Sequence, residues 1–353
     1  MSRSLVEVRD LKMHFPIKAG LLRKTVGHVK AVDGVSFDIL EGETLGLVGE
    51  SGCGKSTITR ALLRVYEPTD GQMIYHGDGE NPADLASMDE ETLTPYRRDI
   101  RLVFQDPQSS LNPRLPVVDI IGEVLAVNGI ATGSELRDHV ADLMQRVGLR
   151  PEMMHRYPHA FSGGERQRIG IARALAPEPK LLIADEAVSA LDVSVQAQTI
   201  NLLMDLQEEF GLTYLFVSHD LSVVQHICDR IAVMYVGNIV EIAPTDGLFE
   251  TPRHPYTEAL LSAAPIPDPT LRGKSSRIRL PGEVADPANP PPGCPFHPRC
   301  RFATDICKTD KPGLRGVSTD GHEVACHHAD DLTLANAFDG AASPQHDQPM
   351  ETA

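Results

Sequence analysis

Short runs of apolar residues recur along the chain and predict a fold in which strands and helices alternate. Apolar and polar positions alternate over Leu5–Leu11 and Val35–Ile39, a period of two that is typical of half-buried strands. Further along, continuous apolar runs typical of strands buried on both faces alternate with helical patterns. This alternation predicts an α/β fold with a mainly parallel sheet. The continuous runs are Thr44–Val48, Ile100–Phe104, Leu181–Ala184, Thr213–Val217 and Arg230–Met234.

Segments with other patterns separate these strands. Ala19–Val29 contains glycine and lysine and is predicted to be a loop, and Gly71–Arg98 is polar and turn-rich. From Val117 to Gly148 the apolar period becomes helical. This stretch predicts a helical subdomain, at about residues 106–165, inserted into the sheet domain. Its apolar face comprises Leu136, Val140, Leu143, Met144 and Val147.

The composition changes after residue 264, which predicts a domain boundary there. Residues 1–264 form one large predicted domain, whereas residues 265–330 are too rich in proline to build regular core elements. Four cysteines predict that this second part is a small, loop-rich module. The tail 331–353 has few large apolar residues and is predicted to be disordered. The cysteines of the module are Cys294, Cys300, Cys307 and Cys326.

The chain has 353 residues and a formal net charge of −16, which bears on its partners. No block of lysine and arginine interrupts the acidity, so a nucleic-acid partner is not expected. No apolar run is long enough to cross a bilayer, and the first residues lack the apolar core of a secretory signal. The protein is therefore expected in the cytoplasm, with any membrane role carried by a partner. In that reducing compartment, clustered cysteines favour metal or cluster ligation over disulfides.

The segment Gly49–Thr57 has the spacing of a phosphate-binding loop. It matches G-x-x-x-x-G-K-[ST] between a predicted strand and a predicted helix over Ser56–Val65. In such a loop Lys55 reaches the β- and γ-phosphates, and the Ser56 hydroxyl ligates Mg²⁺. A glycine-rich turn before a helix is the alternative. The predicted phosphate-binding residues are Gly49, Glu50, Ser51, Gly52, Cys53, Gly54, Lys55, Ser56 and Thr57.

Polar side chains follow three other predicted strands, and together they predict a hydrolytic site. Asp185 suits Mg²⁺, and Glu186 is placed to polarise an attacking water. His219 could contact the γ-phosphate, and Gln105 could touch the metal or the water, because ligands bind at the carboxyl ends of parallel strands. The predicted catalytic residues are thus Glu186, His219 and Gln105. Mg²⁺ is predicted to bind through Ser56, Gln105 and Asp185, with a solvated turn as the alternative for the adjacent acids.

A second predicted anion site lies at Ser162–Gln167, just before a predicted helix over Glu165–Ala174. Its two glycines expose backbone N–H groups at a helix N-terminus. One chain then has two predicted phosphate-binding segments, Gly49–Thr57 and Ser162–Gln167, but only one set of catalytic acids. The second segment is therefore predicted to serve a nucleotide held by a partner chain. A simple helix N-cap at Ser162 is the alternative.

The order of these motifs resembles the nucleotide-binding subunit of an ABC transporter over nearly the whole chain. The resemblance implies a P-loop NTPase core of the RecA-like type with an antiparallel β subdomain. It also implies an ATP sandwich dimer, with Asp192 in the loop that crosses the dimer interface and Gln105 in the loop that couples to the membrane subunit. Phe15 matches the aromatic that stacks on adenine, with a core phenylalanine as the alternative. The residues implied to close over the partner's ATP are Ser162, Gly163, Gly164, Glu165 and Gln167.

Three further segments, Val103–Arg114, His254–Leu261 and Gly293–Cys300, resemble the ATPases of oligopeptide/dipeptide importers. The likeness is to the second ATPase of the pair, so it implies a heterodimer with a paralogous ATPase, a homodimer being less favoured. It further implies two permease subunits, a periplasmic or extracellular solute-binding protein, and a place on the cytoplasmic face of the inner membrane. Peptides are the implied solute, with oligosaccharides, nickel or opines as alternatives.

Two other functions are weighed against this one. A soluble ABC ATPase is disfavoured because the chain lacks a second nucleotide domain and a long coiled coil. A pseudo-ATPase is disfavoured because Glu186 and His219 are both present. One departure from the family pattern is Ala187, where proline commonly follows the catalytic glutamate.

The four C-terminal cysteines have the spacing C-x5-C-x6-C-x18-C. Four thiolates suit a [4Fe–4S] cluster or a structural Zn²⁺. The C-x2-C pairs of zinc ribbons are absent, and the resemblance includes cysteines at comparable places that hold an iron–sulfur cluster in some members. We therefore predict a cluster at Cys294, Cys300, Cys307 and Cys326. His322, His327 and His328 keep Zn²⁺ as the alternative, and free thiols are a further one.

Overall fold

Five strands with parallel pairing carry the predicted continuous apolar runs. Across the sheet their order is β9-β3-β8-β7-β6. Every residue of β3 and β8 is buried, as expected for strands covered on both faces. The strand predictions are confirmed to within one residue at each end. The strands are β3 Thr44–Val48, β6 Ile100–Val103, β7 Leu181–Asp185, β8 Thr213–Val217 and β9 Arg230–Tyr235.

A separate antiparallel sheet has the strand order β2-β1-β4-β5. The prediction of a loop over Ala19–Val29 is wrong: β1 continues to Ala19, and β2 begins at Lys24. The prediction failed because backbone hydrogen bonds between the two strands hold this ribbon, and the side chains there are exposed rather than alternately buried. β4 was missed within the polar segment after Asp70. The strands are β1 Ser4–Ala19, β2 Lys24–Leu40, β4 Asp70–Tyr75 and β5 Ala83–Asp84.

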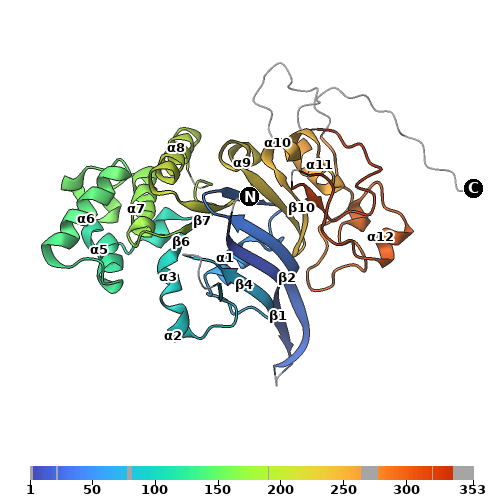
Figure 1. The fold of residues 1–353 in the computed structure, drawn as a ribbon, viewed down its shortest axis with the longest axis horizontal. Coiled ribbons are helices and arrows are strands. Elements are labelled where there is room, and N and C mark those ends of the chain that lie inside the picture. The colour runs from blue at the N-terminus through green and yellow to red at the C-terminus, as the bar shows by residue number, and fades with distance from the viewer. Residues whose placement is uncertain are drawn as a thin grey trace, which may run out of the picture. The chain divides into compact units, whose positions relative to one another are not determined.

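The inserted helices pack on one another beside the edge strand β6. Contacts join α5, α6 and α7 in pairs, and α7 also contacts β6 (Figure 1). Val140, Met144 and Val147 of the predicted apolar face are fully buried. These elements are α4 Pro107–Ser110, α5 Val117–Val127, α6 Gly133–Arg146, η1 Pro151–Met153, η2 Pro158–Ala160 and α7 Gly163–Leu175; the other helices of this part are α1 Lys55–Leu62, α2 Glu90–Leu93, α3 Tyr96–Asp99, α8 Val193–Phe210 and α9 Leu221–Ile227.

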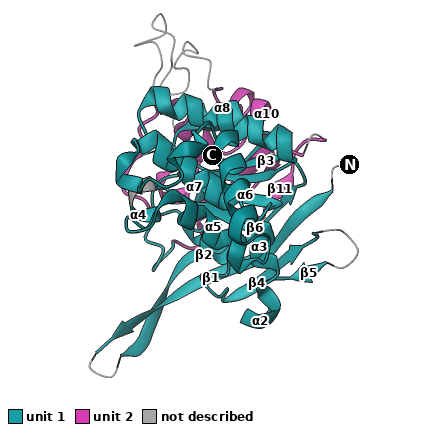
Figure 2. Cartoon of the chain, turned by 90° about the vertical axis from the view of Figure 1, so that its left-hand side faces the viewer, with its two compact units in different colours: residues 1–239, 286–290 teal, residues 240–285, 291–353 magenta. Residues whose placement is uncertain are grey.

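The chain divides into two compact units (Figure 2). Unit 1 comprises residues 1–239 and 286–290, and unit 2 comprises residues 240–285 and 291–353. The second unit therefore begins before the predicted boundary at 264, because His254 and Tyr256, at the start of α11 (Pro255–Ser262), pack against Phe296 of the cysteine-containing segment. The computed structural model describes residues 3–20, 23–77, 82–189, 191–263, 277–319 and 321–336, so most of the predicted tail lies outside the described residues.

Unit 2 is organised around a buried carboxylate, Glu241, which is fully inaccessible to solvent. Its oxygens accept hydrogen bonds from the backbone N–H groups of Arg253 and His254, and His322 Nε2 lies 2.7 Å from Oε1. These contacts join three segments of unit 2 through one side chain. The elements are β10 Asn238–Pro244, α10 Thr245–Glu250, α11 Pro255–Ser262, η4 His297–Arg299, α12 Asp305–Thr309, β11 Arg315–Gly316 and β12 Glu323–Val324, with β12 pairing to both β10 and β11.

Over the described part of the chain, no helix has the length and apolar character needed to span a bilayer.

Candidate active site

The loop between β3 and α1 adopts a conformation that requires glycine at its two ends. Gly49 has φ 149° and Gly54 has φ 112°, both in the region that L side chains rarely adopt. A Cβ on Gly49 would lie 2.3 Å from the carbonyl oxygen of Met234, and a Cβ on Gly54 would lie 2.2 Å from that of Ala31. The loop is therefore wrapped tightly by backbone from other strands, as its sequence pattern predicts.

Lys55 begins α1 and directs its ammonium group back into the loop. Nζ donates to the carbonyl oxygen of Gly49 at 2.7 Å and to that of Glu50 at 3.2 Å, and it lies 3.7 Å from Cys53 Sγ. The side chain is only 6% exposed. Burial raises the pKa of Cys53, so this thiol fills space in the loop as a neutral group.

Asp185 ends β7 directly beneath α1. Its carboxylate accepts hydrogen bonds from Ser56 Oγ at 3.3 Å and from Thr59 Oγ1 at 3.4 Å. Burial raises the pKa of Asp185, and the neighbouring charge of Glu186 raises it further. Ser56 and Asp185 are thus brought together as predicted for a Mg²⁺ site. Thr59 was not predicted, although its position three residues after Ser56 on the same helix face could have indicated it.

Glu186 stands between the two other residues predicted to be catalytic. Gln105 Nε2 donates to Glu186 Oε2 at 2.6 Å, and His219 Nδ1 lies 3.5 Å from Glu186 Oε1. The backbone N–H of Glu186 donates to Val217 of β8, and its φ of 49° lies in the left-handed region. A non-glycine residue in this region costs about 1–3 kcal/mol, and such strain is concentrated at functional sites. The backbone therefore turns this carboxylate out of the sheet toward Gln105 and His219.

The segment Ser162–Gln167 forms the N-terminus of α7 through a capping box. The N–H of Glu165 donates to Ser162 Oγ at 3.3 Å, and the N–H of Ser162 donates to Glu165 Oε2 at 2.8 Å. The bond from the Ser162 backbone holds the pKa of Glu165 below its usual range. A Cβ on Gly164 would lie 2.5 Å from Val195 Cγ1 of α8, whereas the Cβ of Gly163 would meet open space. Gln167 is buried, so it belongs to the packing of α7 rather than to its exposed end.

Two outlying predicted residues have defined local roles. Asp192 caps α8, because its Oδ1 accepts from the N–H of Val195 at 3.0 Å and from Ser194 Oγ at 2.7 Å. The bond from Ser194 lowers the pKa of Asp192. Phe15 is half-buried in β1 and packs edge-to-face against Tyr66, with ring centroids 5.3 Å apart. Tyr66 lies just after α1, and no sequence pattern indicated this contact.

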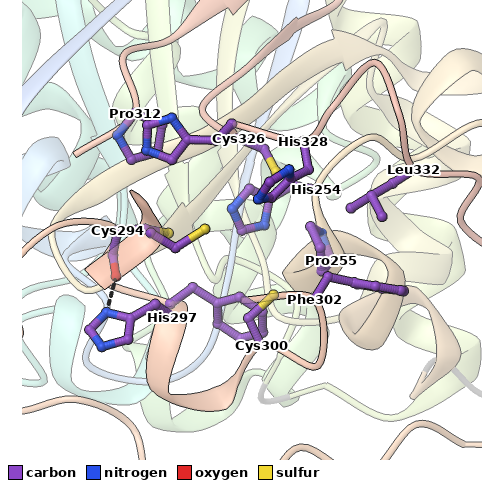
Figure 3. A pocket seen from close by; sticks show the side chains of 13 residues that line it. His254, Pro255, Cys294, His297, Cys300, Phe302, Pro312, Cys326, His328 and Leu332 are labelled. Atoms are coloured by element: carbon purple, nitrogen blue, oxygen red, sulfur yellow. Dashed lines mark hydrogen bonds between the residues drawn. The ribbon is translucent and has the colours of Figure 1, made fainter. Parts of the chain in front are cut away.

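The four predicted cysteine ligands line one cavity of unit 2 (Figure 3). Burial raises the pKa of Cys294, that of Cys300 to about 12 and that of Cys326 to about 11. His254 also lines the cavity, and burial lowers its pKa to about 3, so its imidazole is neutral. Within the described residues, no three histidine, cysteine or acidic side chains form a group that could hold a metal ion. The fold therefore gathers the four thiols along one cavity.

Comparison with known proteins decides the family. Residues 32–189 match the ABC transporter family, and residues 240–307 match the C-terminal region of oligopeptide/dipeptide transporters. The oligopeptide transport ATP-binding protein AppF of Bacillus subtilis is 53% identical over 92% of this chain and 97% of its own length. The chain belongs to the ABC transporter ATPase family. The predicted family is confirmed, and ATP hydrolysis is the reaction of this enzyme.

Further relatives and solved structures agree with this membership. The dipeptide transport ATP-binding protein DppF of Haemophilus influenzae is 50% identical over 92% of this chain and 97% of its own length. Among solved structures, a dimeric ATP-binding cassette in a post-hydrolysis state, bound to ADP and Pi, aligns with a TM-score of 0.59 and 29% identity. The alignment covers 68% of this chain and 98% of the cassette. The predicted P-loop NTPase fold of this ABC ATPase is confirmed.

We expect Asp185→Asn to raise the melting temperature of the nucleotide-free ABC ATPase at neutral pH. The raised pKa means that the folded state favours the protonated carboxyl, so its charge opposes folding once the pH rises through that pKa. A gain of about 1 kcal/mol corresponds to roughly 1–2 °C in a chain of this size. Thermal unfolding over a pH series measures the effect, and the difference from wild type should vanish at acidic pH. Asp205→Asn, at an exposed position of α8, is the matched control; an equal rise there would contradict the explanation.

Proposed function

We propose that this ABC ATPase energises an importer for peptides or a related solute, through ATP-driven dimer closure followed by hydrolysis. The observation that carries the proposal is the grouping of Gln105, Glu186 and His219 at the sheet edge that also holds the phosphate loop. The solute class is supported by relatives whose names describe oligopeptide and dipeptide transport. Importers of oligosaccharides, nickel or opines remain the alternatives, and a soluble ABC ATPase is the least favoured one.

Glu186 is proposed as the general base for the attacking water. Its two carboxylate oxygens face different partners, the amide of Gln105 and the imidazole of His219. Gln105 donates to the carboxylate and so fixes its orientation, while His219 is 60% exposed and free to reach a γ-phosphate. The water gives a proton to Glu186 as its oxygen attacks phosphorus, and the bond from phosphorus to the bridging oxygen of ADP breaks.

Charge neutralisation at the phosphates is assigned to the loop and to Mg²⁺. Lys55 would leave the carbonyl oxygens of its own loop and bind the β- and γ-phosphates. Ser56 and Asp185 would hold Mg²⁺, with Gln105, two residues after β6, as a further oxygen ligand. The ion supplies compensation for the negative charge of the phosphates. The remaining loop residues contribute backbone N–H groups.

The exposed N-terminus of α7 is proposed to complete the site of a partner subunit. Ser162 satisfies its bonds within the first turn of its own helix, so Gly163 and Gly164 are left to present backbone N–H groups outward. A dimeric cassette among the structural relatives supports an assembly of two such subunits. We propose a paralogous ATPase as the partner, and Asp192 as the residue that positions the loop between the two sites.

The remaining partners follow from the proposed importer. Two permease subunits would span the membrane, and a periplasmic or extracellular protein would deliver the solute. The ATPase would then be a peripheral subunit on the cytoplasmic face of the inner membrane. Phe15 is proposed to stack on adenine, since its ring is half-buried in β1 next to Tyr66.

An iron–sulfur cluster is proposed for Cys294, Cys300, Cys307 and Cys326. The four thiols line one cavity, and the sequence lacks the C-x2-C pairs that are typical of a structural Zn²⁺ site. In a [4Fe–4S] cluster each cysteine binds a different iron, so the four sulfur atoms lie farther apart than they do around a single ion. Four cysteines that line one cavity are consistent with this arrangement. When bound, the cluster would tie the segments of unit 2 together; no step of ATP hydrolysis depends on it.

We expect Glu186→Gln to lower ATP hydrolysis by the complete importer by at least about 100-fold, because the amide cannot accept the proton of water. Binding of ATP should persist, since the loop and Asp185 are unchanged. Phosphate release and filter binding of labelled ATP measure the two effects. Glu178→Gln is the matched control, because Glu178 also has a positive φ (55°) but is exposed outside the site. Hydrolysis by Glu186→Gln at the wild-type rate would show that Glu186 is not the base.

If each nucleotide site is formed by both subunits, substitutions in the two phosphate-binding segments of this chain should affect nucleotide trapping on different subunits. With vanadate and a photoreactive ATP analogue, Lys55→Ala should abolish labelling of this chain, because its own loop no longer holds phosphate. Ser162→Arg should instead abolish labelling of the partner ATPase and spare this chain. Ser134→Arg, an exposed substitution on α6, should spare both. Loss of labelling on this chain by Ser162→Arg would place the serine at its own nucleotide and refute the trans assignment.

The cluster proposal predicts that anaerobically purified protein is brown and contains about four irons and four acid-labile sulfides. Cys300→Ser or Cys307→Ser should lose the visible absorbance and the iron. Cys228→Ser, which removes a buried thiol of unit 1, should lose neither. Stoichiometric zinc without iron, or absorbance that survives both ligand substitutions, would refute the cluster.

A further inference from the structure

The β1–β2 hairpin carries a local charge opposite to that of the chain. Residues 11–32 contain no aspartate or glutamate, although the formal net charge of the protein is −16. The basic residues of this stretch are scattered in the sequence and form no block. The antiparallel pairing brings them together, because Ala19 pairs with Lys24 and Lys18 pairs with Thr25. The basic residues are Lys12, Lys18, Arg23, Lys24 and Lys30.

Among the described residues, the basic side chains near the base of the hairpin form ion pairs with acidic residues, whereas those near its tip do not. Lys12 forms ion pairs with Asp10 and Asp70, and Lys30 forms one with Asp33. Lys18, Arg23 and Lys24 are exposed, and none of the three forms an ion pair among the described residues. Their charge is therefore available to an external anion. We call these three residues the tip cations.

Exposed apolar side chains lie among the tip cations. Ile17 is 36% exposed and Val26 is 65% exposed. Ile17 pairs with Gly27, and Val26 falls at the register shift that follows, so both belong to the same end of the ribbon. Cations mixed with exposed aliphatic side chains are typical of segments that lie in the interface of an anionic membrane.

The hairpin also has the reach that such a contact requires. β1 and β2 are 16 and 17 residues long, much longer than any strand of the parallel sheet. Figure 2 shows their ribbon extending beyond the other elements of unit 1. A flat surface can therefore meet the tip without first meeting the acidic remainder of unit 1.

We infer that the tip of the β1–β2 hairpin binds anionic lipid headgroups of the membrane in which the permeases lie. This inference rests on the proposed role as a peripheral importer subunit. The tip cations attract the headgroups, and Ile17 and Val26 enter the boundary between headgroups and acyl chains. The tip then provides a second attachment, besides the permease contact, and sets the orientation of an otherwise acidic subunit that the membrane repels. Nucleic acid is disfavoured, because that strong negative charge opposes binding to a polyanion that is approached from many sides.

The test is binding of the purified full-length chain to vesicles that contain no permease, so its outcome is independent of transport. Wild type should sediment with phosphatidylglycerol/phosphatidylcholine vesicles at low salt and stay in solution with pure phosphatidylcholine. Lys18→Glu/Lys24→Glu should weaken the partition at least about 10-fold, since each cation near an anionic surface contributes roughly 5-fold. Val26→Ser should weaken binding and leave its salt dependence unchanged.

Arg137→Glu/Arg150→Glu is the control of equal charge change, at exposed positions of the helical part of unit 1. It should bind vesicles like wild type, and all variants should keep the wild-type melting temperature and ATP binding. Absence of vesicle binding by wild type, or equal loss in both double variants, would overturn the inference. Tighter binding to heparin or to the paralogous ATPase than to vesicles, lost in Lys18→Glu/Lys24→Glu, would overturn the lipid assignment.

Discussion

The site of this ABC ATPase depends on one constraint, which is that the carboxyl ends of neighbouring parallel strands lie at the same edge of the sheet. β7 lies between β6 and β8, and β8 pairs with β3, so four successive strand ends meet there. Each end is followed within two residues by a part of the proposed site: the glycine loop after β3, Gln105 after β6, Glu186 after β7 and His219 after β8. Residues far apart in the chain therefore come within hydrogen-bond distance without any long connecting segment.

Much of this arrangement could be predicted from the sequence, because a strand that is buried on both faces has apolar residues at successive positions. The runs marked the strand ends, and the polar residues after them marked the site. The alternation over Leu5–Leu11 and Val35–Ile39 marked the inner parts of β1 and β2, but the outer part of their hairpin could not be found in this way. Its strands are held there by backbone hydrogen bonds, and its exposed side chains leave no periodic signal. Tyr66 was missed for a related reason, since its contact with Phe15 depends on how α1 ends against another sheet.

The thiols of unit 2 show a different limit of sequence reasoning. Their spacing predicted that the four thiols bind one cluster or metal ion, and the structure does place them around one cavity. What spacing alone could not show is the buried carboxylate of Glu241, which joins β10, the start of α11 and the segment of His322. That side chain is distant in sequence from the cysteines and has no motif. It is recognisable only through its complete burial and its hydrogen bonds.

The position of Lys55 has a consequence for which anions can occupy the loop. Its ammonium group donates hydrogen bonds to two carbonyl oxygens of the loop itself. An incoming anion must replace those bonds as well as shed its own hydration. A triphosphate chain offers many oxygens along the loop and can compensate for both losses, whereas a lone orthophosphate offers few. The carbonyl oxygens of the loop thus compete with an anion for Lys55, and a chain of phosphates meets this competition better than a single phosphate does.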